Sequence, residues 1–347
     1  MGQAISKLTI KGYKSIRSLE DFELRSLNIL IGPNGAGKSN FISFFQLLTE
    51  IFKKNKVLDN YVKRIGGADK LFFLGTKITH EIEVDLEISN IIESFKLLAT
   101  SDDKLSYQNV GVDVDYSNDE ETKRKFVLIS KQLAACVLYH FCDTSDFAAV
   151  KRPCSKRDYE YLRPDASNLA AFLLFLKKKH ERQYENIRET VQLAAPFFDD
   201  FLLRDSLDNP DETLLEWHQK NSDYPFHPSQ ISDGTLRFIC LATALLQPNP
   251  PSTILLDEPE LGMHPYALTL LAGLIQKASN RTQVIVSTQS AALIDHFEPP
   301  DIVVVERHNG ESIFKRLNKA DLKVWLEDYS LGELWQKNVF GGRPARE

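Results

Sequence analysis

The sequence predicts an α/β fold built on a parallel sheet, and two observations in its C-terminal third indicate this. Short, nearly uninterrupted apolar runs recur in STILLDEPE, TQVIVSTQS and DIVVVER, at residues 252–260, 282–290 and 301–307. Helix-like segments at 229–248 and 264–280 separate these runs. A strand covered by helices on both faces meets no water on either side, so it is apolar throughout. The alternation of such strands with helices therefore indicates a parallel sheet with helices on both faces.

The rest of the chain predicts further strands and a division into three segments. Residues 4–31 contain two or three strands, beginning with an alternating edge strand and ending with a nearly continuous central strand at 27–31. Helical periodicity over residues 169–198, with polar, turn-rich stretches nearby, indicates a mainly helical insertion. We expect a β-rich N-terminal lobe at 1–89, this insertion at 90–226, and a parallel-sheet C-terminal lobe at 227–347.

The composition is that of an ordinary globular protein, with 43% hydrophobic residues, 26% charged residues and a formal net charge of −6. This balance argues against a protein permanently coated with DNA, although a local basic groove stays open. Basic clusters at 53–64 and 177–182 are interpreted as solvated helix faces, with nucleic-acid contact as the alternative. No apolar run approaches the ~18 residues of a membrane span. The four cysteines in 347 residues indicate a reducing compartment, so we expect a cytoplasmic protein.

A glycine-rich loop follows the predicted strand at 27–31 and precedes a helix-like run from Phe41 to Leu48. Its centre, Gly32–Ser39, fits the pattern G-x-x-x-x-G-K-[ST]. Strand, loop and helix stand in the order that a phosphate-binding loop requires. Glycines let successive backbone N–H groups point at phosphate oxygens, where side chains would block them. Lys38 is expected to reach the β- and γ-phosphates, and the Ser39 hydroxyl is expected to bind Mg²⁺.

Two adjacent carboxylates follow the apolar run at 253–256. Asp257 is expected at the C-terminal end of a central strand, where open α/β sheets hold ligands, and it can hold Mg²⁺ through the ion's water shell. Glu258 is then placed to orient and deprotonate a water for in-line attack on the γ-phosphate. The alternative, an acidic pair at a helix N-terminus, is disfavoured by the glycine loop upstream.

These motifs resemble those of ATPases of the ABC/SMC/RecF class: GPNGAGKSN is similar to Walker A, ILLDEPE to Walker B with its catalytic glutamate, and SDGTLRF to a degenerate signature motif. More narrowly, the chain resembles AAA_21-type predicted ATPases of the AAA family, which are related to the ATPase domains of OLD and Gabija-type anti-phage proteins. The segments GYKSI, DASNLAA and DYSLGELWQKNVFGGRP carry that narrower likeness. The resemblance implies an ABC-type P-loop NTPase head without a TOPRIM domain, which binds ATP and Mg²⁺ and hydrolyses ATP. It assigns nucleotide contacts to Asn34, Gly35, Ala36, Gly37, Lys38, Ser39 and Asn40.

In that class, the signature loop of one protomer closes over the ATP held by another, so the resemblance implies a head-to-tail homodimer or a higher oligomer. Ser232 and Gly234 are then expected to contact the γ-phosphate in trans, at the N-terminus of the following helix. Without the resemblance, these residues predict only a helix cap. The class places a switch histidine where this chain has Gln289. Glutamine can hydrogen-bond the γ-phosphate or the attacking water but cannot titrate near neutral pH, so Gln289 is a candidate catalytic residue without the histidine's acid–base chemistry.

The expected function is a Mg²⁺-dependent ATPase that dimerises around ATP and acts as a switch on DNA or on an effector protein such as a nuclease, in anti-phage defence or DNA repair. ATP would bridge two protomers and hydrolysis would remove the bridge, which gives two states with different affinities for a partner. An OLD-type nuclease acting alone is the first alternative, disfavoured because no D-x-D motif follows residue 306. A transporter ATPase subunit is disfavoured by the absent LSGGQ and switch histidine, and no membrane partner is expected. A phosphoryl-transfer kinase is disfavoured because Glu258 favours water as the nucleophile.

The C-terminal segment LKVWLEDYSLGELWQKNVFGGRPARE is predicted to form one helix that ends at Gly341–Gly342. Its aromatic residues, among them Trp325 and Trp335, are expected to pack on the C-terminal lobe. An interface for an effector protein is the alternative.

Overall fold

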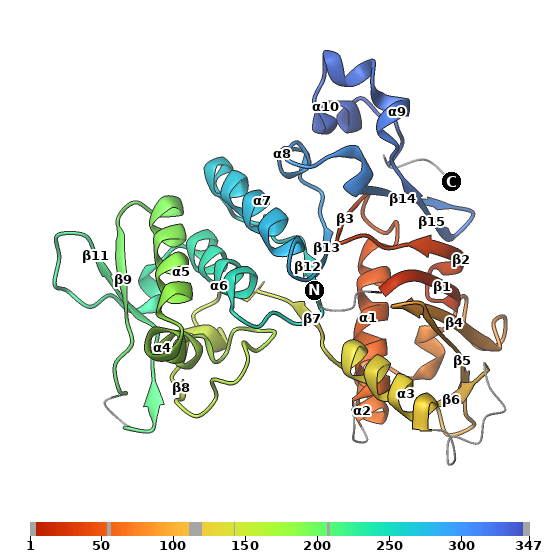
Figure 1. Cartoon of the computed structure of the whole chain (residues 1–347), viewed down its shortest axis with the longest axis horizontal. Coiled ribbons are helices and arrows are strands. Elements are labelled where there is room, and N and C mark those ends of the chain that lie inside the picture. Colours follow the sequence, from red (N-terminus) through yellow and green to blue (C-terminus); the bar gives the residue numbers. More distant parts are fainter. Residues whose placement is uncertain (1–4, 54–56, 111–119, 142, 207–208, 343–347) are drawn as a thin grey trace. The chain divides into compact units, whose positions relative to one another are not determined.

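The computed structural model describes residues 5–53, 57–110, 120–141, 143–206 and 209–342. The chain forms two compact units, each described by itself. The first unit contains residues 1–137, 251–255 and 280–347, and the second contains residues 138–250 and 256–279. Within these described residues the fold is of the predicted α/β class, with a six-stranded mixed sheet, a five-stranded antiparallel sheet, two two-stranded antiparallel sheets and helices (Figure 1).

The mixed sheet carries the glycine loop. Its strand order among the described residues is β15-β14-β3-β13-β12-β7. Strand β3 lies between β13 and β14 and runs parallel to both, so the predicted parallel arrangement is confirmed for these three strands. All residues of β3 and β13 are buried, which explains their continuous apolar sequence. Strand β15 pairs antiparallel with β14 at the edge. The strands are β3 (Leu27–Ile31), β7 (Cys136–Tyr139), β12 (Thr253–Asp257), β13 (Gln283–Ser287), β14 (Ile302–His308) and β15 (Glu311–Arg316).

The antiparallel sheet has the strand order β2-β1-β4-β5-β6. The prediction of an edge strand at the start of the chain is wrong, because β1 pairs with both β2 and β4. The sheet also extends past residue 89, into the segment expected to be mainly helical. Ser89 and Asn90, with φ of 52° and 64°, form a two-residue hairpin turn between β4 and β5 that lacks the usual glycine. The strands are β1 (Ile5–Tyr13), β2 (Ile16–Glu23), β4 (Glu81–Ile88), β5 (Ile91–Ala99) and β6 (Leu105–Asn109).

Helix α1 (Lys38–Phe52) joins the two sheets of the first unit through its aromatic residues. The Phe41 ring lies 5.9 Å from Phe22 of β2 and 5.2 Å from Phe314 of β15. On the antiparallel sheet, Tyr13 meets Phe44 edge to face at 5.3 Å. These ring contacts hold the first turns of α1 against β1, β2 and β15. The other helices of this unit are α2 (Val57–Arg64), η1 (Ala68–Leu71), α3 (Glu120–Ala134), α8 (Ala291–Ile294) and η4 (Pro299–Asp301).

The second unit is a group of helices with short strand pairs. Helix α6 contacts both α5 and α7. It was expected to be amphipathic, but every residue from Leu236 to Leu246 is buried, since helices cover it on more than one side. The Trp217 ring of β11 stacks on Phe198 of β9 and on Phe226. The elements are η2 (Ala149–Lys151), β8 (Cys154–Ser155), α4 (Leu169–Lys179), α5 (Glu181–Ala194), β9 (Phe198–Leu202), β10 (Glu212–Thr213), β11 (Glu216–Gln219), η3 (Pro228–Gln230), α6 (Asp233–Leu246) and α7 (Pro265–Ser279).

The C-terminal segment does not form the single predicted helix. It contains α9 (Lys319–Leu322), η5 (Trp325–Glu327) and α10 (Leu331–Gln336). Ser330 interrupts the helix because its backbone is extended, and its side chain accepts a hydrogen bond from Glu333 N to cap α10. Trp325 is 47% exposed, whereas the Trp335 indole donates to Gly342 O at 3.2 Å. One of the two tryptophans is therefore packed and the other is largely on the surface.

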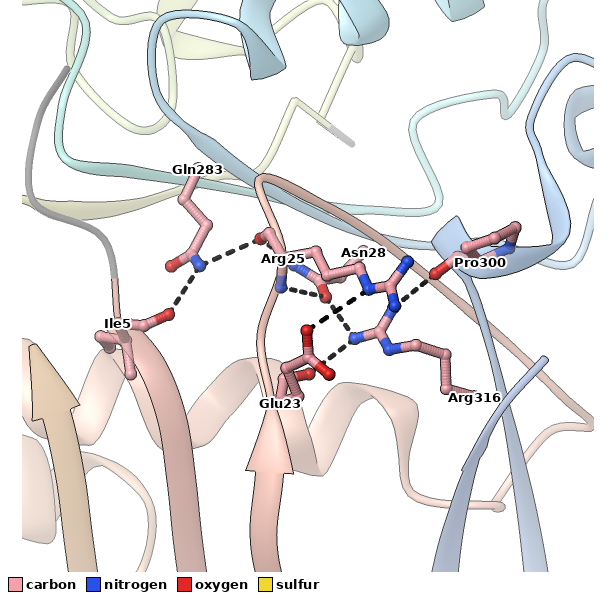
Figure 2. A network of polar contacts seen from close by, with 7 residues as sticks. All are labelled: Ile5, Glu23, Arg25, Asn28, Gln283, Pro300 and Arg316. Carbon is pink, nitrogen blue, oxygen red and sulfur yellow. Dashed lines mark hydrogen bonds and ion pairs between the residues drawn. The ribbon is translucent and has the colours of Figure 1, made fainter. Parts of the chain in front are cut away.

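A polar network joins the starts of β3 and β13 to the edge strand β15 (Figure 2). The Arg316 guanidinium donates to Asn28 Oδ1 at 2.6 Å, to Glu23 O at 2.8 Å and to Pro300 O at 3.0 Å. Gln283 donates to Ile5 O at 2.9 Å. Burial lowers the pKa of Arg316 to about 10. This network is a structural clip at the end of β3 opposite to the glycine loop.

No helix among the described residues is long and apolar enough to cross a membrane.

Candidate nucleotide-binding site

The glycine loop begins directly after β3, and two of its glycines have no room for a side chain. Gly32 has φ of 147°, and a Cβ there would overlap the Val305 carbonyl of β14. Gly37 has φ of 113°, and a Cβ there would overlap Ser312 Oγ and lie 2.8 Å from Ser15 Oγ. L-residues rarely adopt such φ values. The loop geometry therefore requires glycine at both positions for conformational and steric reasons.

Lys38, the first residue of α1, is turned back over the loop. Its side chain is only 5% exposed, and Nζ donates to Gly32 O at 2.7 Å and to Pro33 O at 3.2 Å. Asn34, Gly35 and Ser39 are exposed. The first turn of α1 contains no acidic residue, so the positive end of the helix dipole has no carboxylate of its own helix beside it. This arrangement is suited to an anion at the mouth of the loop.

A group of hydroxyl and amide side chains supports the loop from below, and the motif alone did not predict it. Ser312 Oγ donates to Ala36 O at 2.6 Å and lies 2.7 Å from Ser15 Oγ, within hydrogen-bond distance. Asn40, expected to contact nucleotide, donates its amide to Ser15 Oγ at 2.7 Å. Ser15 belongs to the GYKSI segment, one of the segments that carry the family resemblance. It follows that this segment helps to hold the loop.

Lys14, the neighbour of Ser15, is also directed at α1. It has φ of 46°, and its Nζ donates to Ser43 Oγ at 2.8 Å, while the Tyr13 hydroxyl lies 3.0 Å from the same oxygen. Burial lowers the pKa of Lys14 and raises the pKa of Tyr13. Three residues of the β1–β2 turn thus meet the first turns of α1.

Gln289 lies at the same edge of the mixed sheet as the glycine loop. Ser287, the last residue of β13, is aligned with Leu30 of β3, and Thr288 N donates to Leu30 O at 3.0 Å. The carboxyl ends of parallel strands meet at one edge of a sheet, so residues 288–290 leave the sheet where the glycine loop does. The first unit therefore brings together the glycine loop and the predicted switch position.

The paired carboxylates stand at the end of β12, in the second unit. Asp257 is the last residue of the strand, and Glu258 has φ of 46°. A left-handed backbone at glutamate is uncommon and carries strain. Both residues line a small hollow with Tyr139, Phe141 and Arg237. Burial raises the pKa of Tyr139 to about 12, so its hydroxyl stays protonated and accepts from Gln247 Nε2 at 2.9 Å.

The predicted signature residues also lie in the second unit, at the start of α6. Ser232 is exposed and caps α6, its Oγ accepting from Thr235 N at 3.3 Å. A Cβ on Gly234 would overlap the carbonyl of Gly262. Arg237 donates from Nη1 to Leu261 O and from Nε to Phe141 O, the latter at 3.0 Å. The signature turn is thus packed directly on residues 260–264, which the sequence alone did not predict.

The chain thus has a glycine loop of the P-loop pattern after β3 and a carboxylate pair at the end of β12, a strand of the same sheet. No curated protein sequence matches the chain. Residues 143–295 match the family AAA_21, described as "AAA domain, putative AbiEii toxin, Type IV TA system".

Solved structures show the fold. An Smc head bound to the C-winged helix domain of ScpA is 18% identical, with a TM-score of 0.63 over 92% of this chain and 99% of that one. An Smc head domain with an extended coiled coil, bound to the C-terminal domain of ScpA from Pyrococcus furiosus, is 17% identical, with a TM-score of 0.60 over 94% and 99%. The chain therefore has the fold of Smc head domains, and residues 143–295 are similar to the AAA_21 family, in line with the resemblance seen in the sequence.

Proposed function

We propose that this chain is a Mg²⁺-dependent ATP hydrolase that dimerises head to tail around ATP. The observation that carries the proposal is the glycine loop itself: two glycines without room for a side chain, a buried lysine folded over loop carbonyls, and an open helix N-terminus at one place. An anion that enters the loop offers Lys38 a stronger partner than two neutral carbonyls. The same groups suit the polyphosphate of ATP.

In this proposal each predicted site residue has its own role in ATP binding or hydrolysis. The loop residues Asn34 to Asn40 bind the phosphates, with Lys38 on the β- and γ-oxygens. Ser39 and Asp257 would hold Mg²⁺, which neutralises the charge that develops on the transferred phosphoryl group. Glu258 orients and deprotonates the attacking water. Gln289 hydrogen-bonds that water or the γ-phosphate, without titrating.

Ser232 and Gly234 are proposed to complete the site of a second protomer. Support comes from the exposure of Ser232 and from its place at the N-terminus of α6, a helix long enough to carry a useful dipole. Each protomer would supply one glycine loop and one signature turn, so two copies would enclose two ATP molecules. Hydrolysis would then separate them.

The output of the switch is proposed to be an effector protein, such as a nuclease, or DNA, in anti-phage defence or DNA repair in the cytoplasm. The Smc heads of similar fold were solved bound to domains of ScpA, which illustrates that this fold can carry a protein partner. Lys177, Lys178 and Lys179 are all exposed on α4, and Lys177 is paired with Asp200 at 3.0 Å. A short run of exposed lysines, one of them paired, is more typical of a solvated helix face than of a nucleic-acid groove, so the protein partner is preferred.

Glu258→Gln tests the proposal, because it preserves the shape of the side chain and removes the base. With ATP and Mg²⁺ the variant is expected to elute as a dimer from a sizing column and to hydrolyse no ATP. Lys38→Ala is the control, expected to stay monomeric. A Glu258→Gln variant that binds ATP but remains monomeric would contradict the trans site.

Mixing two inactive variants separates a cis from a trans signature. Lys38→Ala and Ser232→Ala are each expected to be inactive, and their mixed dimer should regain one intact site of two. Mixed dimers that form but show no hydrolysis would mean that Ser232 acts within its own chain.

A further inference from the structure

The C-terminal segment contacts β14 and the α8 region that follows β13, and these two strands flank β3. On one side, Gly332 N of α10 donates to Asp295 Oδ1 at 2.6 Å, just beyond α8, which follows β13. On the other side, Gly342 N donates to Glu306 Oε1 of β14 at 2.9 Å. Helices α8 and α10 are in contact (Figure 1). The segment therefore links β14 to the α8 region that follows β13.

The contact between α10 and α8 leaves no space at Gly332. A Cβ there would lie 2.5 Å from Ala291 O and 2.8 Å from Asp295 Oδ1. Leu334, on the same helix, is fully buried. Any side chain at position 332 would push α10 away from α8 or shift α8 itself. The glycine is thus required by close packing, since its φ is not one that excludes other residues.

Only a short, well-fixed stretch separates this contact from Gln289. Ser290 N donates to Thr288 Oγ1 at 3.0 Å, and Ser290 Oγ caps α8 by accepting from Leu293 N at 3.1 Å. Thr288, Leu293 and Ile294 are fully buried. A stretch held by its own hydrogen bonds and by burial transmits a displacement at Ala291 to Gln289 instead of absorbing it.

We propose that Asp295 and Gly332 are positioning residues for ATP hydrolysis, which hold Gln289 in register with the glycine loop through α8. The inference rests on the proposed ATPase function and adds a role for the C-terminal segment. Neither residue is assigned a contact with nucleotide. Their effect is on the orientation of the Gln289 amide, so it belongs to the hydrolytic step more than to ATP binding.

Matched glycine variants test this proposal. Gly332→Ala is expected to lower kcat about tenfold, because small misplacements of a catalytic group are costly, while the Kd for a fluorescent ATP analogue changes less than twofold. Gly273→Ala is the control, since Gly273 also lies in a helix but has open space around its Cα. Asp295→Ala should behave as Gly332→Ala does, whereas Asp295→Asn keeps an acceptor oxygen and should retain activity.

A double variant separates positioning from general destabilisation. In a Gln289→Ala background, Gly332→Ala is expected to cause no further loss of kcat, because the group it displaces is absent. Equal kcat for Gly332→Ala and Gly273→Ala, or a full further loss in the Gln289→Ala background, would overturn the proposal. If Gly332→Ala fails to fold, the comparison of Asp295→Ala with Asp295→Asn decides the same question. No hydrolysis by the unaltered chain would instead refute the proposed function.

Discussion

Gly37→Ala should destabilise the chain, because Ser312 packs directly against the glycine loop at this position. The new Cβ would overlap Ser312 Oγ and sit 2.9 Å from Ser312 Cβ, at φ of 113°. A non-glycine residue in such a conformation costs about 1–3 kcal/mol. Displacing Ser312 also breaks its hydrogen bonds to Ala36 O and Ser15 Oγ, at about 1 kcal/mol each. The expected loss of stability is therefore about 3–5 kcal/mol.

Thermal melting of the nucleotide-free chain measures this loss, with Gly66→Ala as the matched control. Gly66 has φ of 92°, but the nearest atom to its added Cβ is 3.9 Å away, so this variant carries backbone strain without overlap. The free energy of unfolding of Gly37→Ala should be about 2 kcal/mol lower than that of Gly66→Ala. It should also lose affinity for an ATP analogue. Ser312→Gly should restore part of the stability of Gly37→Ala by removing the overlapped atoms. Equal melting of the two alanine variants, with unchanged nucleotide affinity, would refute the reasoning.

Three further predictions follow from strained or buried groups. Glu258→Gly should be more stable than Glu258→Ala by about 1 kcal/mol in thermal melting, because φ of 46° suits glycine, and the reverse order would contradict strain at this residue. Arg316→Met should lower the free energy of unfolding by about 2–3 kcal/mol in denaturant titration, because three hydrogen bonds are lost. The affinity for an ATP analogue should not change. A reduced affinity would show that this network also influences the glycine loop. Burial raises the pKa of Glu93 above 4.5, so its contribution to stability is present below that pH and is lost as pH rises through the folded-state pKa. Glu93→Gln should therefore be more stable than the unaltered chain at neutral pH and equally stable below pH 4.5. A stability difference between the two chains that does not change with pH would exclude titration of Glu93 as its cause.

The local parts of the fold and of the site were predictable. The phosphate loop has a sequence pattern with a physical cause at each position, and Gly32 and Gly37 have the conformations that the pattern demands. The strands at 27–31 and 283–287 and the first part of the strand at 302–308 were predictable because burial on both faces favours apolar residues there.

The remaining features depend on contacts between residues that are distant in the sequence. Ser15, Asn40 and Ser312 meet in space, and nothing near any one of them identifies the other two. The β4–β5 turn was missed because Ser89 and Asn90 adopt positive φ without the glycine that usually marks such turns. The C-terminal helix was predicted too long because serine is tolerated within helices, and Ser330 acts as a cap only because its own backbone is extended.

The close approach of Gly234 to Gly262 has a consequence for association. Because these two backbones touch and Arg237 bridges to Leu261, the turn at Ser232 and residues 260–264 form a single preassembled surface. A ligand or second protomer that meets this surface does not have to order two separate loops. Ordering side chains and loops costs about 0.5–1.5 kcal/mol for each immobilised side chain, and here much of that cost has already been met during folding. A larger residue at position 234 would therefore weaken association by loosening the surface, even if it made no contact with the partner.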